Sequence, residues 1–260
     1  MKVAKILENL SLHLESHIQN YNYIMLYTDF RFLANYPEVV EKKNVVLSEI
    51  FSLLKKTNKT FFTPSYSYTN CGRFDIESTP TNVSALSKWL VGNKDTKRSA
   101  HPIFSYIGLG KDTDLLDKIG KSAFGYNSLY CRLRNKNAGF LHLGREVYLG
   151  NTIIHHVEHM AGATYRFHKH FKTGVFDNGK YVDTNYSAFV RRRDVRGHDF
   201  SFNFKSCAKT LFDNKLITET NGVLDTPYLA SYSLDKSLDM MFCMFEKNPS
   251  IFLNKKFEQD

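Results

Sequence analysis

Short apolar runs that end in polar residues alternate with segments of helical periodicity, and this alternation constrains the fold more than any other feature. Residues 23–29 (YIMLYTD), 59–68 and 139–144 (GFLHLG) are typical of strands. Residues 45–56 (VVLSEIFSLLKK) repeat apolar side chains at helical spacing. Strands that alternate with helices predict an α/β fold, with a central mixed sheet flanked by helices.

The remaining segments fit the same fold class. Further helices are expected at the amphipathic N-terminus, in residues 82–91, from Asn151 or Thr152 onward, and in residues 234–245. From Val175 onward the pattern weakens into strands or loops. Neither an internal repeat nor a linker rich in Pro, Gly or Ser divides the chain. We therefore expect a single domain over residues 1–260.

The charge of the chain favours anionic partners. Lysine and arginine exceed aspartate and glutamate by 35 to 26, which gives a net charge of +9. Such an excess attracts nucleic acids, phosphorylated metabolites, nucleotide-linked compounds or anionic lipids. The only tight basic cluster is RRRDVR at residues 191–196, which is too short for a polybasic nucleic-acid arm. The cluster is interpreted as a solvated face, with binding of a pyrophosphate by Arg191, Arg193 or Arg196 as the alternative, and no nucleic-acid partner is expected.

The predicted location is the cytoplasm. No apolar run approaches the roughly 18 residues of a membrane span, and the N-terminus lacks the apolar centre of a signal peptide. The cysteines Cys71, Cys131, Cys207 and Cys243 lie far apart without a CxxC pair. This spacing favours free thiols in a reducing compartment over a disulfide framework or a structural zinc site.

Polar residues follow the predicted strands at the points where the strands end. Ligands of α/β sheets bind at the carboxyl ends of strands. The residues at these positions are Thr28, Asp29, Ser65, Tyr66 and Asn151. A ligand site is therefore predicted at this edge of the sheet.

The segment GNTIIHHVEHM, residues 150–160, carries the densest group of catalytic residue types. In a helix that begins near Thr152, His155 and Glu158 lie three residues apart, so their side chains can touch. His156 is expected to be exposed. One buried apolar stripe is predicted, made of Ile153, Ile154, Val157, Met160 and Ala161.

Three interpretations of this segment compete. It can be a surface helix with an Asn or Thr cap and a stabilising His–Glu pair. Alternatively, His155, Glu158 and His159 match the H-x-x-E-H pattern of inverted zinc peptidases, but the downstream glutamates offer no persuasive third ligand. Finally, His155 can be a general base held in one tautomer by Glu158, with free N–H groups of the first helical turn nearby. A covalent acyl-enzyme is not indicated, because G-x-S-x-G and catalytic-cysteine signatures are absent.

Four segments together resemble the aminoglycoside 3-N-acetyltransferase family. Its N-T-x-x-H-x-x-E motif after a strand stands here as Asn151, Thr152, His155 and Glu158 after LHLG. Its R-S-x-H-P-x-x-S element stands as Arg98, Ser99, His101, Pro102 and Ser105. TFFTPSY (60–66) and AFGYNSL (123–129) echo two further segments, and the resemblance covers roughly residues 20–172. The chain departs from the family at YTDF, where only Thr28 matches and Asp29 is new, and in its C-terminal third.

The resemblance implies an acyl-CoA-dependent N-acyltransferase that works by direct transfer. In that picture His155 deprotonates the acceptor amine, Glu158 orients the imidazole ring, and Thr152 or nearby N–H groups stabilise the oxyanion. The candidates for binding acyl-CoA are Thr28, Arg98, Ser99 and Ser105. Acetyl-CoA is the default donor and hydroxyacyl-CoA the alternative. No metal is expected.

The acceptor is predicted to carry negative charge of its own. Aminoglycosides are polycations, which a chain of net charge +9 does not favour. The preferred acceptor is therefore a nucleotide-linked amino sugar, as in relatives that act in polysaccharide biosynthesis, with Asp29, Tyr66 and Arg193 as candidate binding residues. An aminoglycoside acceptor and a non-enzymatic anion-binding protein are the alternatives, and a homodimer is the oligomer considered.

Overall fold

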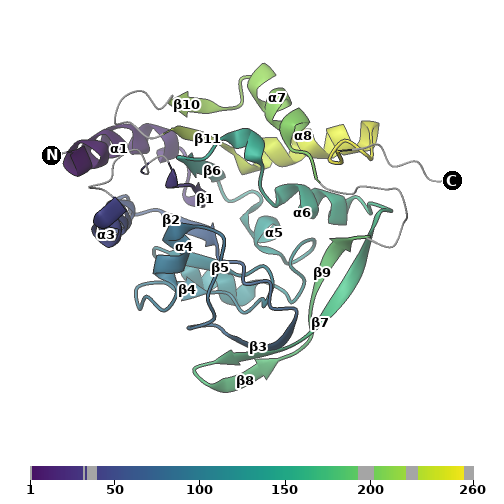
Figure 1. Cartoon of the computed structure of the whole chain (residues 1–260). Coiled ribbons are helices and arrows are strands. Elements are labelled where there is room, and N and C mark those ends of the chain that lie inside the picture. The colour runs from purple at the N-terminus through teal and green to yellow at the C-terminus, as the bar shows by residue number, and fades with distance from the viewer. Residues whose placement is uncertain (1, 32, 34–39, 193–201, 221–227, 255–260) are drawn as a thin grey trace.

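The computed structural model describes residues 2–31, 33, 40–192, 202–220 and 228–254. Strands and helices alternate through much of the chain, as the sequence predicts (Figure 1). In the first half the elements are α1 (Lys2–Ile18), β1 (Tyr23–Thr28), α3 (Lys43–Lys56), β2 (Thr60–Pro64), β3 (Cys71–Asp75), α4 (Ala85–Leu90), β4 (Lys97–Arg98), β5 (Tyr106–Leu109), the 3-10 helix η2 (Thr113–Lys118) and α5 (Leu129–Leu133).

The second half begins with β6 (Ala138–Leu143), which corresponds to the strand predicted at residues 139–144, and it contains more strands than the sequence indicated. Its elements are β6, the 3-10 helix η3 (Val147–Leu149), α6 (Ile153–Met160), β7 (Arg166–Asp177), β8 (Lys180–Asp183), β9 (Tyr186–Arg191), α7 (Lys205–Asp213), β10 (Thr218–Thr220), β11 (Leu229–Ser233) and α8 (Leu234–Lys247). Within the described residues, no helix is both long and apolar enough to span a bilayer.

A seven-stranded mixed sheet forms the centre of the fold, in the order β10-β11-β6-β1-β2-β5-β4. The strand β1 pairs in parallel with β2 and β6, whereas the outer pairs are antiparallel. The predicted α/β class with a central mixed sheet is therefore confirmed. Because the three central strands are parallel, their carboxyl ends meet at one edge.

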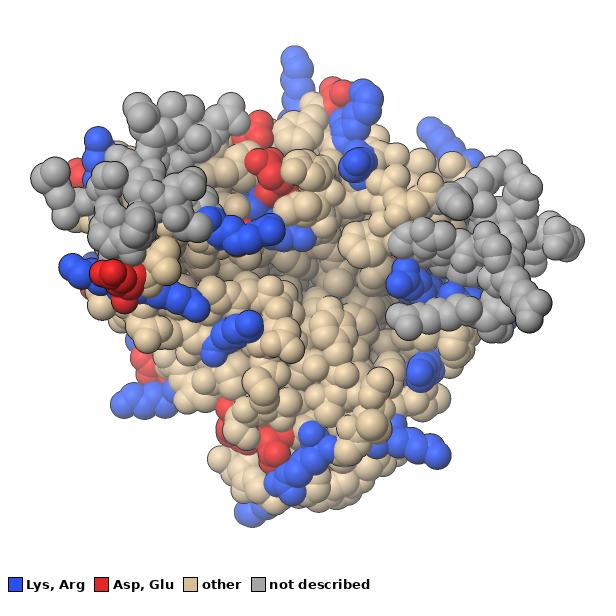
Figure 2. Space-filling model, in the orientation of Figure 1, with Lys and Arg blue, Asp and Glu red and all other residues tan. Residues whose placement is uncertain are grey.

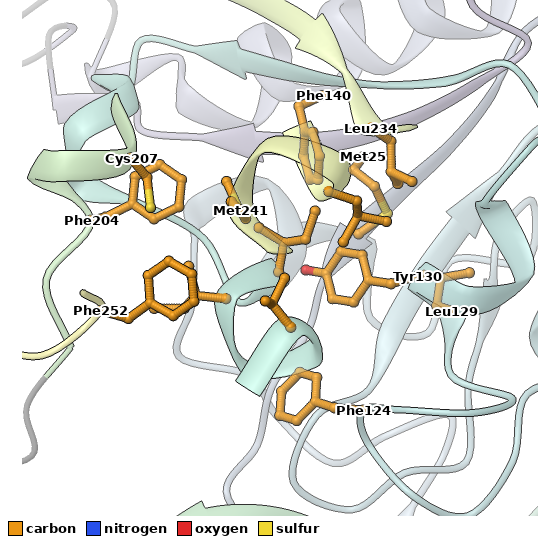
Figure 3. Packing of buried hydrophobic residues seen from close by; sticks show 14 of the residues in the cluster. Met25, Phe124, Leu129, Tyr130, Phe140, Phe204, Cys207, Leu234, Met241 and Phe252 are labelled. Carbon is orange, nitrogen blue, oxygen red and sulfur yellow. The ribbon is translucent and has the colours of Figure 1, made fainter. Parts of the chain in front are cut away.

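Alternation along β1 separates two hydrophobic cores. Ile24 and Leu26 pack with α1, α3 and α4 on one face of the sheet. Met25 and Tyr27 pack on the other face, where α5, α6, α7 and α8 contribute the remaining side chains. Figure 3 shows this second core, with Met25 and Tyr130 among the buried side chains. The helix that carries His155 is thus anchored against the sheet.

The long strand β7 connects the second core to a smaller sheet. Its first half pairs with β9, and its second half pairs with β3 and β8. Figure 1 shows β7 and β9 as a ribbon that leaves the end of α6 and runs towards β3. This ribbon begins with the pair Arg166 and Arg191, so it brings two arginines to the side of α6.

The structure corrects two expectations for α6. Ile153, Ile154 and Val157 are buried as predicted, but Met160 and Ala161 are exposed because the helix ends at Met160. His156 was expected to be exposed and is 2% exposed. Its Nδ1 atom accepts the N–H of Gly125 at 3.2 Å and lies 3.2 Å from the Ser128 hydroxyl. Periodicity did not predict this burial because α5 and the preceding turn cover a second side of the helix.

Candidate active site

A cavity of about 1250 Å³ opens beyond the carboxyl ends of the central parallel strands. Thr28 at the end of β1, Tyr66 after β2 and Thr152 after β6 lie in its wall, together with residues of β7 and β9. The cavity therefore lies at the edge of the sheet where the sequence predicted a ligand site, between the first turn of α6 and the β7–β9 ribbon.

A tight turn and an asparagine fix the start of α6. Gly150 has a φ of +69°, and a Cβ atom there would lie 2.6 Å from the side chain of Phe204. The Asn151 side chain accepts the N–H of Ile153 at 3.0 Å and donates to the hydroxyl of Tyr232 at 2.8 Å. Of the two predicted caps, Asn151 is the one that bonds the helix, whereas the Thr152 side chain makes no cap bond.

His155 and Glu158 form the predicted contact. The Nδ1 atom of His155 lies 2.8 Å from Oε2 of Glu158, whose side chain is fully buried. Tyr165 donates its hydroxyl to the other carboxylate oxygen at 2.9 Å. The Nε atom of Arg166 lies 2.7 Å from Oε2 but lacks hydrogen-bond alignment, so this contact is mainly Coulombic. Glu158 is therefore a buried carboxylate with three partners.

The electrostatics of this group favour a neutral imidazole beside an ionised carboxylate. Burial is the main cause that lowers the pKa of His155, the charge of Arg166 lowers it further, and Glu158 opposes both. Burial alone would raise the pKa of Glu158, but the hydrogen bond and charge of His155, the charge of Arg166 and the hydrogen bond from Tyr165 hold it below its usual range. At neutral pH a histidine of this kind can accept a proton.

The hydroxyl of Thr152 lies at the centre of a group of tyrosines. Its Oγ1 atom is 2.8 Å from the hydroxyl of Tyr66 and 2.7 Å from that of Tyr130. The Tyr130 hydroxyl is 2.8 Å from that of Tyr27, and Tyr66 donates to Tyr106 at 3.2 Å. The four tyrosines are buried. Predicted residues Thr152 and Tyr66 are thus directly bonded, one turn from His155.

The two predicted residues that follow β1 differ in their surroundings. Thr28 is 7% exposed and lines the cavity, and its hydroxyl has no hydrogen-bond partner among the described residues. Asp29 instead pairs with the exposed Arg31, whose Nε lies 2.8 Å from Oδ2. Thr28 is therefore available to a ligand, whereas the carboxylate of Asp29 is paired outside the cavity wall.

The predicted cofactor residues Arg98, Ser99 and Ser105 are buried and bonded within the protein. Arg98 donates to the carbonyl of Ser65 at 2.8 Å and to the hydroxyl of Ser105 at 3.2 Å. Ser99 accepts the N–H of Tyr106 at 2.9 Å. None of the three lines the large cavity. Their role in binding acyl-CoA stays a prediction, and these contacts favour support of the segments that carry Tyr66 and Tyr106.

The basic cluster at residues 191–196 lies only partly within the described chain. Arg193 lies outside the described residues. Arg191 and Arg192 line the cavity, as do Lys169 and Arg166 of β7 and Arg145 after β6. The part of the chain that the structure describes contributes no aspartate or glutamate to the cavity wall. The described part of the cavity wall is therefore basic, and one of its cations, Arg166, is paired with the buried Glu158.

Sequence reasoning missed Tyr165, Arg166 and Tyr130. Tyr165 and Arg166 lie shortly after the end of α6 at Met160, and a polar pair close to the helix that carries His155 was the available signal. Tyr130 gave no signal, because it belongs to a short helix whose position relative to Thr152 depends on the whole fold.

The zinc-peptidase pattern does not form a ligand cluster. Within the described ranges, no three side chains of the types His, Cys, Asp and Glu converge on a common point. The His159 ring instead stacks on Phe189, with ring centroids 4.9 Å apart, and contacts His168. His155 and His159 therefore have different surroundings despite their helical spacing.

The comparisons with known proteins agree with this geometry. The family described as aminoglycoside 3-N-acetyltransferase matches residues 50–230. Among curated proteins, no sequence matches. The aminoglycoside acetyltransferase AAC(3)-IVa, solved as an apoenzyme, is 19% identical with a TM-score of 0.71, covering 97% of this chain and 91% of its own.

Two further solved structures share the fold. AAC-IIIb, solved as a binary complex with CoASH, is 14% identical with a TM-score of 0.72, covering 96% of this chain and 98% of its own. YokD from Bacillus subtilis is 16% identical with a TM-score of 0.68, covering 93% of this chain and 99% of its own. The family match extends over more than half of the sequence and includes His155 and Glu158. This chain belongs to the aminoglycoside 3-N-acetyltransferase family and is an acyl-CoA-dependent N-acyltransferase.

Proposed function

We propose that this enzyme transfers an acyl group from acyl-CoA to the amine of an acceptor that carries negative charge, with a nucleotide-linked amino sugar as the preferred class. The carrying observation is the described wall of the cavity, which includes His155 and five basic side chains but no carboxylate. An electropositive wall attracts phosphate groups and repels a polycation.

His155 acts as the general base in this proposal. Glu158 holds the Nδ1–H of the ring, which leaves Nε2 to take a proton from the attacking amine. A carbon–nitrogen bond forms at the thioester carbonyl, the carbon–sulfur bond breaks, and the departing thiolate takes up the proton. The ionised Glu158 stabilises the intermediate imidazolium.

We assign acyl-CoA to the same cavity. Its phosphates need cations, which Arg191, Arg192 and Lys169 offer along the β7–β9 ribbon. The unpartnered Thr28 hydroxyl offers a donor to the thioester or to another polar group. The basic wall can therefore serve the co-substrate, the acceptor or both. Acetyl-CoA is the default donor, and the homodimer and the cytoplasmic location stay predictions.

An aminoglycoside acceptor is the second candidate, and one observation favours it. A variant of AAC(3)-IVa has been solved in complex with a gentamicin, and AAC-VIa has been solved bound to sisomicin. Against this candidate stands the cavity wall, because a polycationic ligand would need carboxylates.

The alternative of a non-enzymatic anion-binding protein would need a continuous basic face. On the face shown in Figure 2, the lysine and arginine side chains are scattered between uncharged residues. A nucleic-acid or polyphosphate binding surface is therefore not favoured on this side of the molecule.

Thiol release from acetyl-CoA tests the proposal. The purified protein is assayed against a panel of nucleotide-linked amino sugars and a panel of aminoglycosides that includes sisomicin, with mass spectrometry of the products. Acylation of the sugar nucleotides alone is the expected result. Acylation of aminoglycosides alone would overturn the assignment of an anionic acceptor and leave the N-acyltransferase activity intact.

A further inference from the structure

Four tyrosine hydroxyls and the Thr152 hydroxyl form one hydrogen-bonded chain beside the cavity. The order along the chain is Tyr27, Tyr130, Thr152, Tyr66 and Tyr106. Burial raises the pKa of all four tyrosines, so each hydroxyl carries its proton at neutral pH. Each of the five groups therefore has a single proton to donate.

One of the four contacts has a donor assigned by its own geometry, since Tyr66 donates to Tyr106; in the other three either hydroxyl can donate, and the count of protons assigns the donor. The only proton of Tyr66 is used in its bond to Tyr106. The contact between Tyr66 and Thr152 is then a hydrogen bond only if Thr152 donates. By the same count Tyr130 donates to Thr152, and Tyr27 donates to Tyr130. The proton of Thr152 is thus committed to Tyr66, and the capacity left on its oxygen is that of an acceptor.

We propose that the Thr152 hydroxyl oxygen accepts a hydrogen bond from the acceptor amine and, together with His155, orients it for attack. Both residues line the cavity and lie three positions apart at the start of α6. A neutral primary amine has two N–H groups and one lone pair. One N–H donates a hydrogen bond to the Thr152 oxygen and the other donates to Nε2 of His155, so the lone pair is directed at the thioester carbon.

The step balances without a further reactant. The amine lone pair forms the carbon–nitrogen bond, and Nε2 of His155 takes the amine proton to which it is hydrogen-bonded. The carbon–sulfur bond breaks, and the proton passes to the leaving thiolate. The N–H bonded to Thr152 stays on the amide product. This inference rests on His155 as the base and does not depend on the charge of the acceptor.

Two consequences follow for the reaction. The sequence assigned Thr152 to the oxyanion, but a hydroxyl whose proton is committed to Tyr66 does not donate to it. The hydroxyl of Thr28, which lacks a partner among the described residues and lines the same cavity, has its proton free for that role. The enzyme should also require a primary amine, because an N-methylated amine has one N–H for two acceptors.

The test compares the two ends of the chain, Tyr106→Phe and Tyr27→Phe. Each variant removes one buried hydroxyl, but only Tyr106→Phe removes the acceptor of the Tyr66 proton. The Tyr66 hydroxyl then donates to Thr152, so the Thr152 hydroxyl directs its own proton towards the amine. Loss of one hydrogen bond and its replacement by an opposed donor should raise the KM for the acceptor about 2- to 12-fold.

The assay uses acetyl-CoA with sisomicin or a UDP-linked amino sugar, whichever is acylated. The expected result is a larger rise in acceptor KM for Tyr106→Phe than for Tyr27→Phe, with the KM for acetyl-CoA the same in both. Equal rises in both variants, or an increase in kcat for Tyr106→Phe, would overturn the proposal. An increase in kcat is what a Thr152 oxyanion donor predicts, because its proton would be freed.

A second pair keeps the test decisive if Tyr106→Phe does not fold. Thr152→Ser retains the acceptor oxygen and Thr152→Val removes it. The ratio of kcat/KM for a primary amine to that for its N-methyl analogue should persist in Thr152→Ser and collapse in Thr152→Val. An unchanged ratio in Thr152→Val would refute the bond to the amine. If His155→Ala retained turnover, the general-base proposal itself would fail, whatever these ratios show.

Discussion

The Nη2 atom of Arg166 lies 2.8 Å from Nδ1 of His155, and both side chains approach the same carboxylate oxygen of Glu158. In the tautomer with the proton on Nδ1, this nitrogen donates to Glu158 and Nε2 is the basic nitrogen of the ring; the Arg166 guanidinium, which can only donate, then contacts Nδ1 through charge alone. The guanidinium then opposes the charged form of His155. Arg166 therefore lowers the pKa of the imidazole whose ring Glu158 orients.

Replacement of Arg166 should move the acid limb of the pH profile. The charge of Arg166 is one cause of the lowered pKa of His155, so Arg166→Gln should raise that pKa. The base form exists above the pKa, so the rise of kcat/KM with pH should start at higher pH than in the wild type. Arg166→Lys keeps the charge and is the matched control. An acid limb that stays in place in Arg166→Gln would contradict this coupling.

Loss of His155 should remove most of the turnover. General bases of this kind contribute about 10²- to 10⁴-fold, so His155→Ala or His155→Asn should slow thiol release by that factor. Thermal unfolding controls for folding, and binding of CoA should persist. Near-normal turnover in a folded His155→Ala variant would exclude the residue as the base.

Lys169 and Lys172 offer a test of the electropositive wall. Both lie on β7, but only Lys169 lines the cavity. With a sugar-nucleotide acceptor, Lys169→Gln should raise the acceptor KM about 3- to 10-fold, and Lys172→Gln should have less effect. With an aminoglycoside the sign reverses, because a repelling charge is removed. If only the KM for acetyl-CoA rises, Lys169 belongs to the co-substrate.

His156 should make the folded state sensitive to acid. Burial lowers its pKa from 6.5 to about 3, so the unfolded chain binds an extra proton between these values. The stability from this site is full above pH 6.5 and is lost as pH falls towards 3, with a slope of about 1.4 kcal/mol per pH unit. The difference in unfolding free energy between the wild type and His156→Gln, from urea titrations at pH 7 and 4.5, should therefore shrink at the lower pH. A constant difference would show that His156 is not buried in its neutral form.

Local spacing was sufficient to predict the contact between His155 and Glu158. His155 and Glu158 touch because residues three apart share a helix face, and the helix begins where Asn151 can cap it. The strands around residues 23–29 and 139–144 were also predicted, because a buried parallel strand is a short run of apolar residues. These features depend on interactions between near neighbours in the chain.

The burial of His156 and the ionic partner of Glu158 were decided by tertiary structure. Helical periodicity defines which residues share a face, but not how many neighbouring elements cover it. His156 is enclosed because α5 packs on a second side of α6. Arg166 reaches Glu158 because β7 begins beside the end of α6, so that the first residue of the strand lies next to the carboxylate.

By itself, the sequence determined an α/β fold, its family resemblance and a histidine–glutamate pair at the start of a helix. Only the tertiary structure decided what surrounds that pair. The hydroxyls of Tyr27, Tyr106 and Tyr130 come from two strands and a short helix, and sequence spacing carries no information about their distance from Thr152. The direction of the hydrogen bonds in such a cluster depends on which hydroxyls lie next to each other, because each hydroxyl has one proton to donate. The sequence does not encode which hydroxyls are neighbours.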